Sequence, residues 1–442
     1  MPKHVLIEKA KAVLQANWRQ GYTIPSPHLY PFQWNWDAGF IMLGWLQIDP
    51  DRATQEFRSL FKGQWSNGFL PHIIFHQEVQ DQYFPNADFW DSQVSDFAPR
   101  KLKTSGITQP PVHGFVLERF LAKSNGSAHL NFVEEAFHKV CQLHRYYYEN
   151  RDPKQEGLVN ICHPWESGRD NSPIWNEVYQ HWTLSPEEVP PYQRVTPELA
   201  KAQERPTTDD YNRYVYLLDL CRGHQYQDTL IQGSSPFLVQ DTLFNSILIE
   251  SNASLIRIGQ LLGLNVKDLK TWQATAIEQF NRKLWNSDLQ CYVPFDLRND
   301  RPILVREIGG LLALFAGIPH QKRAQELMNT LLSSAFSVKE KGQAYLCPTF
   351  DRTHPGFEGH KYWRGPIWIN TNWMLYHGLK RYGRVTLAQE VKNDSLELIE
   401  QLGMYEYFDA DKLKTRQQEK AYGSNDFSWT AALYLDLISE NL

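Results

Sequence analysis

Helical periodicity is the feature that most constrains how this chain folds. Apolar residues recur three and four positions apart in long segments whose other positions are mostly polar. Such spacing is typical of amphipathic helices, and the long alternating runs that indicate strands are scarce. The pattern covers residues 5–18, 112–121, 128–148, 246–262, 269–284, 308–316, 324–336, 368–382, 387–402 and 428–437. We therefore predict an all-α fold, with short hairpins such as one near residues 293–297.

Long loops rich in Pro, Gly and aromatic residues connect these segments. They span residues 19–36, 63–75, 81–111, 150–175, 183–212, 286–306 and 338–367. Loops of this length in a compact protein are usually functional. Helices paired by such loops suggest an α/α toroid with a cleft at one end. No low-complexity linker divides the chain, so we predict a single domain, residues 1–442, with an excursion over the cleft at about 183–210.

Charge and cysteine content argue against several classes of protein. The net charge is -5, with no block of like charge, so we expect neither a nucleic-acid partner nor a membrane partner. The five cysteines are scattered without CxxC spacing, which fits reduced thiols in a cytoplasmic protein better than disulfides or a zinc cluster. The N-terminus lacks the apolar core of a signal peptide, and no apolar run is long enough to cross a bilayer.

Aromatic residues are abundant, with 15 Trp, 21 Tyr and 23 Phe. Many of the tryptophans lie beside polar residues rather than inside apolar runs, as in FQWNWD and YWRG. Trp and Tyr offer a flat apolar face and a hydrogen-bonding edge. A sugar ring needs both, because its C–H faces stack and its hydroxyls form hydrogen bonds. The pattern therefore favours a carbohydrate ligand.

Residues 163–173, HPWESGRDNSP, place Glu166 and Asp170 in a turn-forming stretch flanked by tryptophans. We expect a loop here, followed by a helix with Ser172 as its N-cap and Pro173 in its first position. Apolar walls disfavour an ionised carboxylate and raise its pKa, as a proton donor near neutral pH requires. Asp170 is thus a candidate general acid, and an Asx-turn that caps backbone amides is an equal alternative.

Several other polar residues lie in or beside the loops. Asp37 can accept hydrogen bonds from two sugar hydroxyls, although N-capping of the following helix is the stronger local interpretation. His72 and His76 have the i,i+4 spacing of metal ligands, but no third ligand is evident, so we interpret them as hydrogen-bonded pocket or core histidines. Gln109, held extended by the prolines after it, offers a rigid amide to a sugar or to a neighbouring loop.

Two charged residues lie among aromatics in the last part of the chain. Arg364 is positioned to clamp a carboxylate or stack on a ring, with a buried structural arginine as the alternative. Glu406 lies between two tyrosines, far along the chain from Asp170. Paired carboxylates from distant segments are the usual equipment for glycoside hydrolysis.

Five motifs, in this order, resemble those of glycoside hydrolase family 63. They are FQWNWD, SGITQPP, HPWESGRDNSP, YWRGPIWINTNW, and EYFD followed by DFSWTAAL. The similarity runs from about residue 28 to residue 435 and is greatest to the short bacterial mannosylglycerate and glucosylglycerate hydrolases. ESGxD with a late WTxA segment is also similar to trehalases. The resemblance implies an (α/α)6 barrel, inversion at the anomeric carbon, and neither a cofactor nor a metal.

The same motifs imply roles for individual residues. Asp170 resembles the general acid, and Glu406 resembles the general base that activates water. An arginine of the 205–213 stretch, Arg205 or Arg213, is expected to reach the substrate. The remaining substrate-binding residues that we expect are Tyr30, Trp34, Trp36, Asp37, Gln109, Trp165, Gly168, Tyr362, Trp363, Arg364 and Trp368.

Two features depart from this pattern. Residues 410–423 are longer and more charged than the Gly-rich turn expected between EYFD and SWTAA, which leaves Glu419 as an alternative base. Arg169 precedes Asp170 directly, and its charge and the following helix N-terminus would both lower the carboxyl's pKa. We therefore expect Arg169 to point away from Asp170 or to bind substrate.

These observations predict an inverting hydrolase of a small α-linked glycoside, either glucosylglycerate or mannosylglycerate. An anionic aglycone would suit Arg364 or an arginine of the 205–213 stretch. The alternatives are an α-glucosidase acting on a disaccharide of trehalose, kojibiose or nigerose type, a sugar epimerase that uses the histidine pair, and a non-catalytic sugar-binding barrel. A homo-oligomer is compatible with the sequence.

Overall fold

The computed structural model describes residues 3–27, 29–76, 83–123, 127–194, 204–337, 346–411 and 420–440. The statements below concern these residues. Most of them are helical, and the strands are only two or three residues long. The predicted all-α class is confirmed.

An inner ring of helices forms the centre of the molecule. Each element contacts the next, and the last contacts the first, so the ring is closed. Within the described residues it consists of α2 (Asn35–Ile48), α5 (His113–Lys123), α10 (Thr242–Leu262), α12 (Ile308–Leu311) continued by η6 (Leu312–Leu314), α14 (Ile369–Arg381) and α16 (Ser428–Ser439). Helices α2 and α16 are buried on nearly all sides, as expected for helices that are apolar all round.

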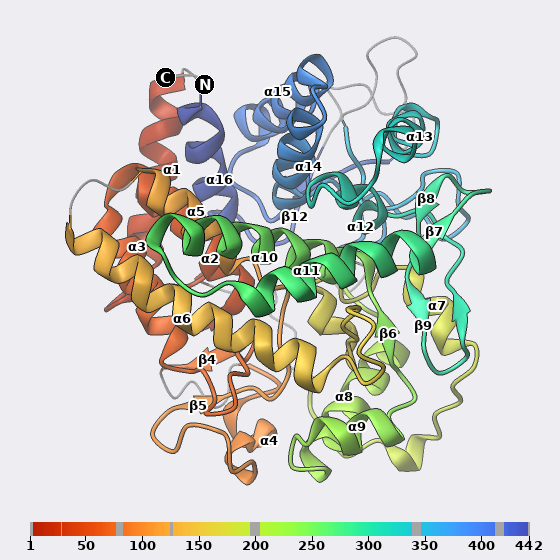
Figure 1. Cartoon of the computed structure of the whole chain (residues 1–442). Coiled ribbons are helices and arrows are strands. Elements are labelled where there is room, and N and C mark those ends of the chain that lie inside the picture. The colour runs from red at the N-terminus through yellow and green to blue at the C-terminus, as the bar shows by residue number, and fades with distance from the viewer. Residues whose placement is uncertain are drawn as a thin grey trace.

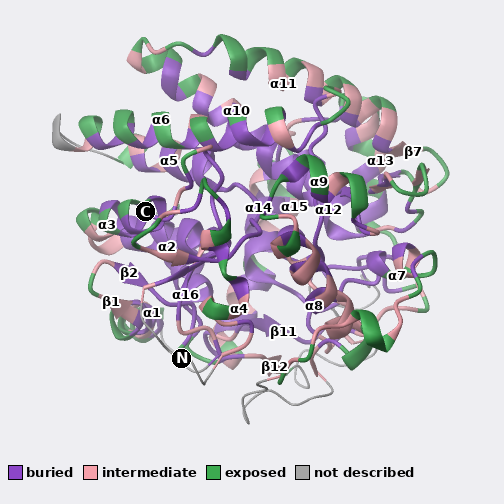
Figure 2. Ribbon diagram, turned by 90° about the horizontal axis from the view of Figure 1, so that it is seen from below, coloured by how far each residue is buried: buried purple, intermediate pink, exposed green. Residues whose placement is uncertain are grey.

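A second layer of helices surrounds this ring. The outer helices α6 and α11 bury one face and expose the other, so Figure 2 shows them with green outer surfaces. The layer comprises α1 (Lys3–Asn17), α3 (Pro50–Phe61), α6 (Ser127–Asn150), α11 (Lys267–Gln279), α13 (Gln321–Leu332) and α15 (Val385–Leu402). Inner and outer helices alternate along the chain, which is the arrangement of an (α/α)6 barrel.

Several helices lie outside the segments predicted from periodicity. Among them are α3, α8 (Thr208–Gly223) and α9 (Asp228–Ser234). Helix α8 begins inside the predicted excursion. A capping box marks its start, because Thr207 accepts from the Asp210 amide while the Asp210 carboxylate accepts from the Thr207 amide. The spacing of Thr207 and Asp210, which is typical of a capping box, could have been recognised in the sequence.

Short antiparallel strand pairs tie the loops together. The predicted hairpin near residues 293–297 is β9 (Phe295–Asp296) with β10 (Arg301–Pro302), and β9 also pairs with β6 (Val239–Gln240). A second sheet joins β3 (Gln33–Trp34), β4 (Ile73–Phe75) and β5 (Lys103–Thr104). The remaining pairs are β1 (Trp18–Arg19) with β2 (Tyr22–Thr23), β7 (Trp285–Asn286) with β8 (Cys291–Tyr292), and β11 (Tyr407–Phe408) with β12 (Ala421–Tyr422).

The connections before the inner helices gather at one end of the barrel. Trp34, Trp368 and Phe427 are the N-caps of α2, α14 and α16, and Asp241 and Glu307 are the N-caps of α10 and α12. Strands β4 and β5 and helices α4 (Ala87–Trp90), α8 and α9 lie at the lower end in Figure 1, away from the two chain termini. Loops from distant parts of the sequence can therefore build one site there.

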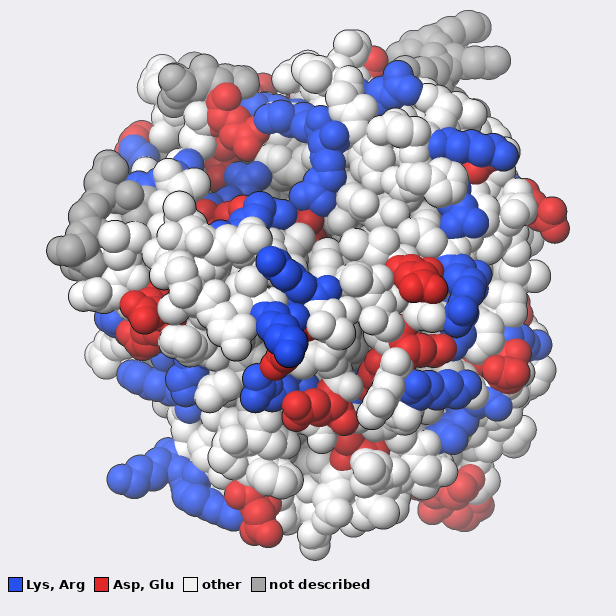
Figure 3. All heavy atoms as spheres, viewed as in Figure 1, with Lys and Arg blue, Asp and Glu red and all other residues white. Residues whose placement is uncertain are grey.

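Surface properties agree with the composition. Lys, Arg, Asp and Glu side chains are interspersed over the face shown in Figure 3. All five cysteines are free thiols. Among the described helices, none has both the length and the apolar character that crossing a membrane requires.

Close packing of α2 against α16 depends on Gly44. A Cβ at this position would lie 2.5 Å from the Cα atom of Ala432, which is backbone that cannot move aside on its own. We expect Gly44→Ala to lower the free energy of unfolding by about 1–3 kcal/mol, as overpacking typically does. Urea denaturation measures this change. Gly223→Ala, where an added Cβ meets no atom within 4 Å, is the control and should leave stability unchanged or slightly improved. Equal stability of the two variants would refute the packing argument.

Candidate active site

A cavity lies at the end of the barrel where the inner helices begin. The structure brings together in its lining nearly all the residues that the motifs pointed to. They are Tyr30, Trp34, Trp36, Asp37, Gln109, Trp165, Gly168, Asp170, Arg205, Tyr362, Trp363, Trp368 and Glu406. Three predicted residues are not among them. Arg364 and Arg213 lie elsewhere, and Glu419 falls in residues 412–419, outside the described part of the chain.

Asp170 follows a sharply turned loop. The 3-10 helix η2 (Pro164–Ser167) ends at Gly168, whose φ of +71° favours glycine. A Cβ on Gly168 would lie 2.5 Å from the Trp36 ring, so glycine also permits this close approach. Helix α7 (Ile174–Tyr179) starts one residue later than predicted, and no side chain caps it. The prediction of Ser172 as the N-cap is therefore wrong, and Asp170 does not cap this helix.

The pocket raises the pKa of Asp170 to about 7. Enclosure of the carboxyl group is the main cause, and the negative charge of Glu406 acts in the same direction. Arg205 and the backbone amide of Asp170 itself act in the opposite direction. Near neutral pH a substantial fraction of Asp170 is therefore protonated and able to donate a proton.

Glu406 lies in the same pocket in a different environment. Its carboxylate accepts hydrogen bonds from the Tyr30 hydroxyl (2.8 Å) and the Ser424 amide (3.1 Å), and Arg205 Nη2 lies 3.7 Å away. The pKa of Glu406 is raised, because burial outweighs the opposing influence of Arg205, Tyr30 and Ser424, which stabilise the ionised form. The pairing of β11 with β12 brings Ser424 to this carboxylate.

Asp37 is the third carboxylate of the pocket. Helix α2 begins at Asn35 with Trp34 as its N-cap, so Asp37 lies in the first turn and the interpretation of Asp37 as the N-cap is wrong. Burial raises its pKa well above the usual range, and the charges of Glu406 and Asp170 raise it further. Gln109 lies nearby, and its Oε1 accepts from the backbone N–H of Trp36 at 3.2 Å, which fixes the orientation of the amide.

The two arginine candidates of the 205–213 stretch occupy different places. Arg205 Nη1 donates to the Tyr30 hydroxyl at 2.9 Å, and its guanidinium lies 4.8 Å from the centre of the Tyr362 ring in the pocket. Arg213 lies over the rings of Tyr179 and Trp182 instead. The cavity therefore holds Arg205 and not Arg213.

Arg364 is held outside the cavity. Its Nε donates to Glu358 at 2.5 Å, and its Nη1 and Nη2 donate to the carbonyl oxygens of Asn171 and Gly356. This placement matches the alternative of a structural arginine. We therefore interpret Arg364 as a structural residue and not as a ligand of the substrate.

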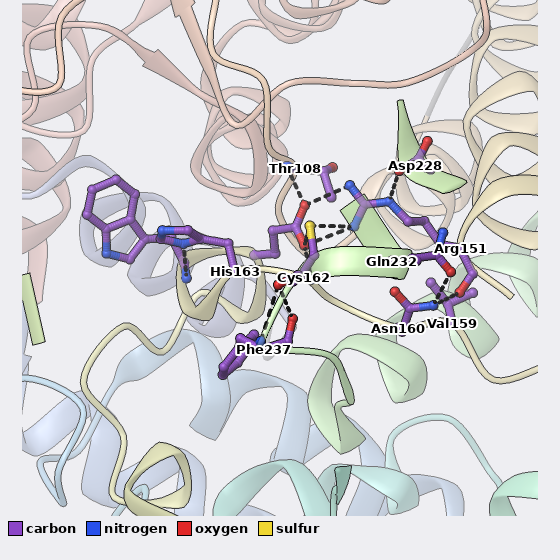
Figure 4. Close-up of polar contacts among 12 residues, drawn as sticks. Thr108, Arg151, Val159, Asn160, Cys162, His163, Asp228, Gln232 and Phe237 are labelled. Atoms are coloured by element: carbon purple, nitrogen blue, oxygen red, sulfur yellow. Dashed lines mark hydrogen bonds and ion pairs between the residues drawn. The ribbon is translucent and has the colours of Figure 1, made fainter. Parts of the chain in front are cut away.

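Glu166, the other carboxylate of the 163–173 segment, is buried away from the pocket. It accepts from both terminal nitrogens of Arg151, each at 3.1 Å, and from the Cys162 amide at 2.8 Å. Arg151 also pairs with Asp228, as Figure 4 shows. This network anchors the start of the loop that carries Asp170.

Aromatic rings form much of the pocket wall. Trp363 and Trp368 stack with ring centres 3.8 Å apart, and Trp36 lies against Trp363 at 6.1 Å. On the other side Trp165 packs against Tyr214 at 5.3 Å. These rings offer flat apolar faces next to the carboxylates, as a sugar ring requires.

Comparison with known proteins identifies the family. Residues 30–430 match the family described as "Mannosylglycerate hydrolase MGH1-like glycoside hydrolase domain". The chain belongs to this family. It is a glycoside hydrolase, as its resemblance to glycoside hydrolase family 63 predicted.

Relatives and solved structures agree with this assignment. The chain is 40% identical to a mannosylglycerate hydrolase of Rubrobacter radiotolerans, over 98% of this chain and 97% of that one. It is 30% identical to a glucosylglycerate hydrolase of Mycolicibacterium hassiacum, over 98% and 97%. Crystal structures of the family 63 mannosylglycerate hydrolase of Thermus thermophilus, 40% identical over 98% and 99% of the chains, superpose with TM-scores of 0.88 in complex with Tris and D-glycerate and 0.85 in complex with glucose.

Some pocket residues of this glycoside hydrolase carried no usable signal in the sequence. They are Leu29, Tyr83, Phe84, Arg194, Pro206 and Tyr211. Phe427 and Trp429 also line the pocket, as does His72, which the sequence had suggested as a pocket or core histidine. Trp429 belongs to the SWTAA motif, which pointed to this region without singling it out. The interpretation of the histidines is confirmed: His72 Nδ1 lies 2.6 Å from Ser105 Oγ, His76 Nε2 lies 2.8 Å from Gln33 Oε1, and they flank β4 rather than a helix.

Gly423 controls the position of Glu406 in this glycoside hydrolase. A Cβ on Gly423 would lie 2.1 Å from Oε2 of Glu406, and its φ is +71°. We expect Gly423→Ala to lower kcat at least about tenfold, because it displaces Glu406, which the motifs imply as the general base, and misplacing a reacting group by an ångström can cost up to about a hundredfold.

Gly383→Ala is the matched control for this substitution. Gly383 has the same φ of +71°, but an added Cβ there meets no atom within 4 Å. Both variants carry the same backbone strain, so only the displacement of Glu406 separates them. Steady-state kinetics and thermal unfolding of the two proteins measure the difference. Equal losses of activity would show that Gly423 matters only through its backbone conformation.

Proposed function

We propose that this glycoside hydrolase cleaves the α-linked glucoside or mannoside of glycerate, with inversion at the anomeric carbon. Asp170 acts as the general acid and Glu406 as the general base. The observation that carries the proposal is that these two carboxylates face one pocket with different hydrogen-bonding partners: the Glu406 carboxylate accepts from the Tyr30 hydroxyl and the Ser424 amide, whereas enclosure leaves Asp170 partly protonated. Such separation of environments is how an enzyme assigns acid and base roles to two similar groups.

The contacts of each carboxylate support its role. Glu406 accepts from a hydroxyl and an amide and lies beside Arg205, all of which favour the ionised form that can take a proton from water. Asp170 is enclosed, and its pKa of about 7 leaves it partly protonated at neutral pH. It can therefore give its proton to the glycosidic oxygen as the bond breaks.

Bond cleavage then follows the inverting course. Glu406 removes a proton from a water molecule, which attacks the anomeric carbon from the face opposite the leaving group while Asp170 protonates that group. An α-linked substrate would yield a β-sugar and free glycerate. Asp37 and the amide of Gln109 are proposed to bind hydroxyls of the sugar that is cleaved, against the indole faces of Trp34 and Trp165.

Arg205 suits an anionic aglycone. Its guanidinium carries five N–H donors, more than its hydrogen bond to Tyr30 and its ion pair with Glu406 use. A carboxylate on the leaving group would take up the remaining donors, and Tyr362 beside the guanidinium would pack against the aglycone. The names of the relatives, and the D-glycerate bound in the Thermus structure, support glycerate as this group.

We also propose a cellular compartment for this protein. Its five free thiols fit a reducing compartment, so we propose the cytoplasm.

Proton NMR with glucosylglycerate and, separately, mannosylglycerate tests the proposed reaction. We expect initial release of the β-sugar from at least one of the two. Asp170→Asn should lower kcat about 10²–10⁴-fold, because it removes the proton donor. Initial release of the α-sugar would exclude inversion, and Asp170→Asn retaining more than about a tenth of the activity would exclude its role. If neither of these substrates is cleaved but an α-linked disaccharide is, the aglycone is a sugar rather than glycerate.

Paired substrates test the role of Arg205. We expect Arg205→Met to lower kcat/KM for glucosylglycerate about 10–100-fold more than for glucosylglycerol, whose aglycone is neutral, because only the former loses a charge-assisted hydrogen bond. Any effect of the substitution on Glu406 itself changes kcat/KM for both substrates alike and cancels in their ratio. Arg213→Met, outside the cavity, is the control and should leave the ratio unchanged. An unchanged ratio in Arg205→Met would contradict an anionic aglycone at this residue.

A further inference from the structure

The side chain of Arg169 turns away from the pocket. It is 1% exposed, and it pairs through Nη2 with Asp241 and through Nη1 with Glu307. Both of these carboxylates are fully buried. Arg169 is absent from the lining of the cavity although its neighbours Gly168 and Asp170 are both present.

The two partners of Arg169 are fixed points of the barrel. Asp241 is the N-cap of α10, and its Oδ1 accepts from the Phe244 amide at 2.8 Å. Glu307 is the N-cap of α12 and accepts from the amides at the start of that helix and from the Thr242 hydroxyl. The residue before Asp170 is therefore tied to two neighbouring helices of the inner ring.

The backbone around Asp170 is held as well. The carbonyl oxygen of Arg169 accepts from Trp175 Nε1 at 2.9 Å. The carbonyl oxygen of Asp170 accepts from the Tyr214 hydroxyl at 2.8 Å. With the side chain of Arg169 anchored and both carbonyls bound, little freedom is left for Asp170 to leave the pocket.

The ion pairs also determine how strongly the positive charge of Arg169 acts on the neighbouring Asp170. Two carboxylates lie against one guanidinium, so the positive charge of Arg169 is paired inside this buried cluster. The charged groups that act on Asp170 across the pocket are Arg205, Glu406 and Asp37. The hydroxyls facing it belong to Tyr83, Tyr179, Tyr211, Tyr214 and Tyr362.

We propose that Arg169 is a positioning residue for the general acid. Its ion pairs with Asp241 and Glu307 hold the adjacent Asp170 in the pocket and keep the positive charge of the arginine from stabilising the ionised carboxylate. The inference rests on the proposed role of Asp170. Buried ion pairs are weak sources of stability, because desolvation offsets their attraction, so a fixed geometry is the better reason for burying three charges here.

Asp241→Asn is the cleanest test. Asn is as good an N-cap as Asp, so the hydrogen bond to Phe244 can persist while the ion pair with Arg169 is lost. Glu250→Gln is the matched control on the same helix. Glu250 is buried and paired with Arg381 at 2.7 Å, about two and a half turns further along α10. Both substitutions remove a buried carboxylate from an arginine, but only the first lies beside the general acid.

We expect the two variants to differ in catalysis rather than in stability. Asp241→Asn should lower kcat at pH 7 about tenfold or more, with KM changed less than about threefold, whereas Glu250→Gln keeps wild-type kinetics. In the wild type, kcat/KM should fall as pH rises through about 7, because the proton donor is lost. Removing the charge of Asp241 favours ionisation of Asp170, so this fall should begin at lower pH in Asp241→Asn.

Carbon-13 NMR of aspartate-labelled protein follows the same carboxyl group without any substrate. The Asp170 signal, assigned by its loss in Asp170→Asn, should titrate at lower pH in Asp241→Asn than in the wild type. If no glycoside is turned over, the proposed function fails, and this titration still decides the role of Arg169. Unchanged kcat and an unchanged titration in folded Asp241→Asn would overturn the proposal.

Arg169→Lys decides the question if Asp241→Asn does not fold. Lysine keeps the charge but lacks the planar fork that reaches both carboxylates. We expect a loss of kcat in the same direction, with KM again little changed. Wild-type kcat and pH dependence in Arg169→Lys would overturn the proposal.

Discussion

Closure of the inner ring of helices is the constraint on which the rest of this structure depends. Because α16 packs against α2, the ring fixes the beginnings of its helices at one end of the barrel. Close approach at Gly44 keeps this junction tight. The residues of the pocket come from segments that are hundreds of positions apart, and only the closed ring places them around one cavity.

The pocket brings two opposing electrostatic effects together. Helix N-termini carry partial positive charge and favour anions, whereas enclosure among aromatic rings disfavours them. For Asp37 and Asp170 enclosure is the larger effect, and it raises both pKa values. Burial also raises the pKa of Glu406, but Tyr30, Ser424 and Arg205 stabilise its ionised form and oppose that rise. Enclosure at this end of the barrel thus raises the pKa of all three carboxyl groups, and Glu406 differs from Asp170 in the hydrogen bonds that its carboxylate accepts from Tyr30 and Ser424.

Much of the fold was predictable from the sequence, because helical periodicity reports burial directly. Helix α8 was missed because its start lies in a Pro-rich, charged stretch, although Thr207 and Asp210 form a recognisable capping box. The register of α2 was also misjudged. Pairing of β3 with β4 leads the chain directly into the helix at Asn35, so Asp37 falls inside its first turn rather than at its cap.

Residues of the site were predictable where a motif pointed to them individually. They were less predictable where the direction of the side chain decides whether a residue reaches the cavity. Arg364 directly follows two aromatic residues in sequence, but its side chain binds Glu358 and does not line the cavity, whereas Arg205 does. Tyr83 lines the pocket from a loop and Tyr211 from the first turn of α8, and no motif pointed to either residue. The pairing of β11 with β12 has a further consequence for how such enzymes diversify. The two strands are joined to each other beside Glu406, and the closure entropy of the segment between them grows only slowly with its length. Insertions and changes of charge in that segment can therefore accumulate without displacing the carboxylate that the strand pair holds in the pocket.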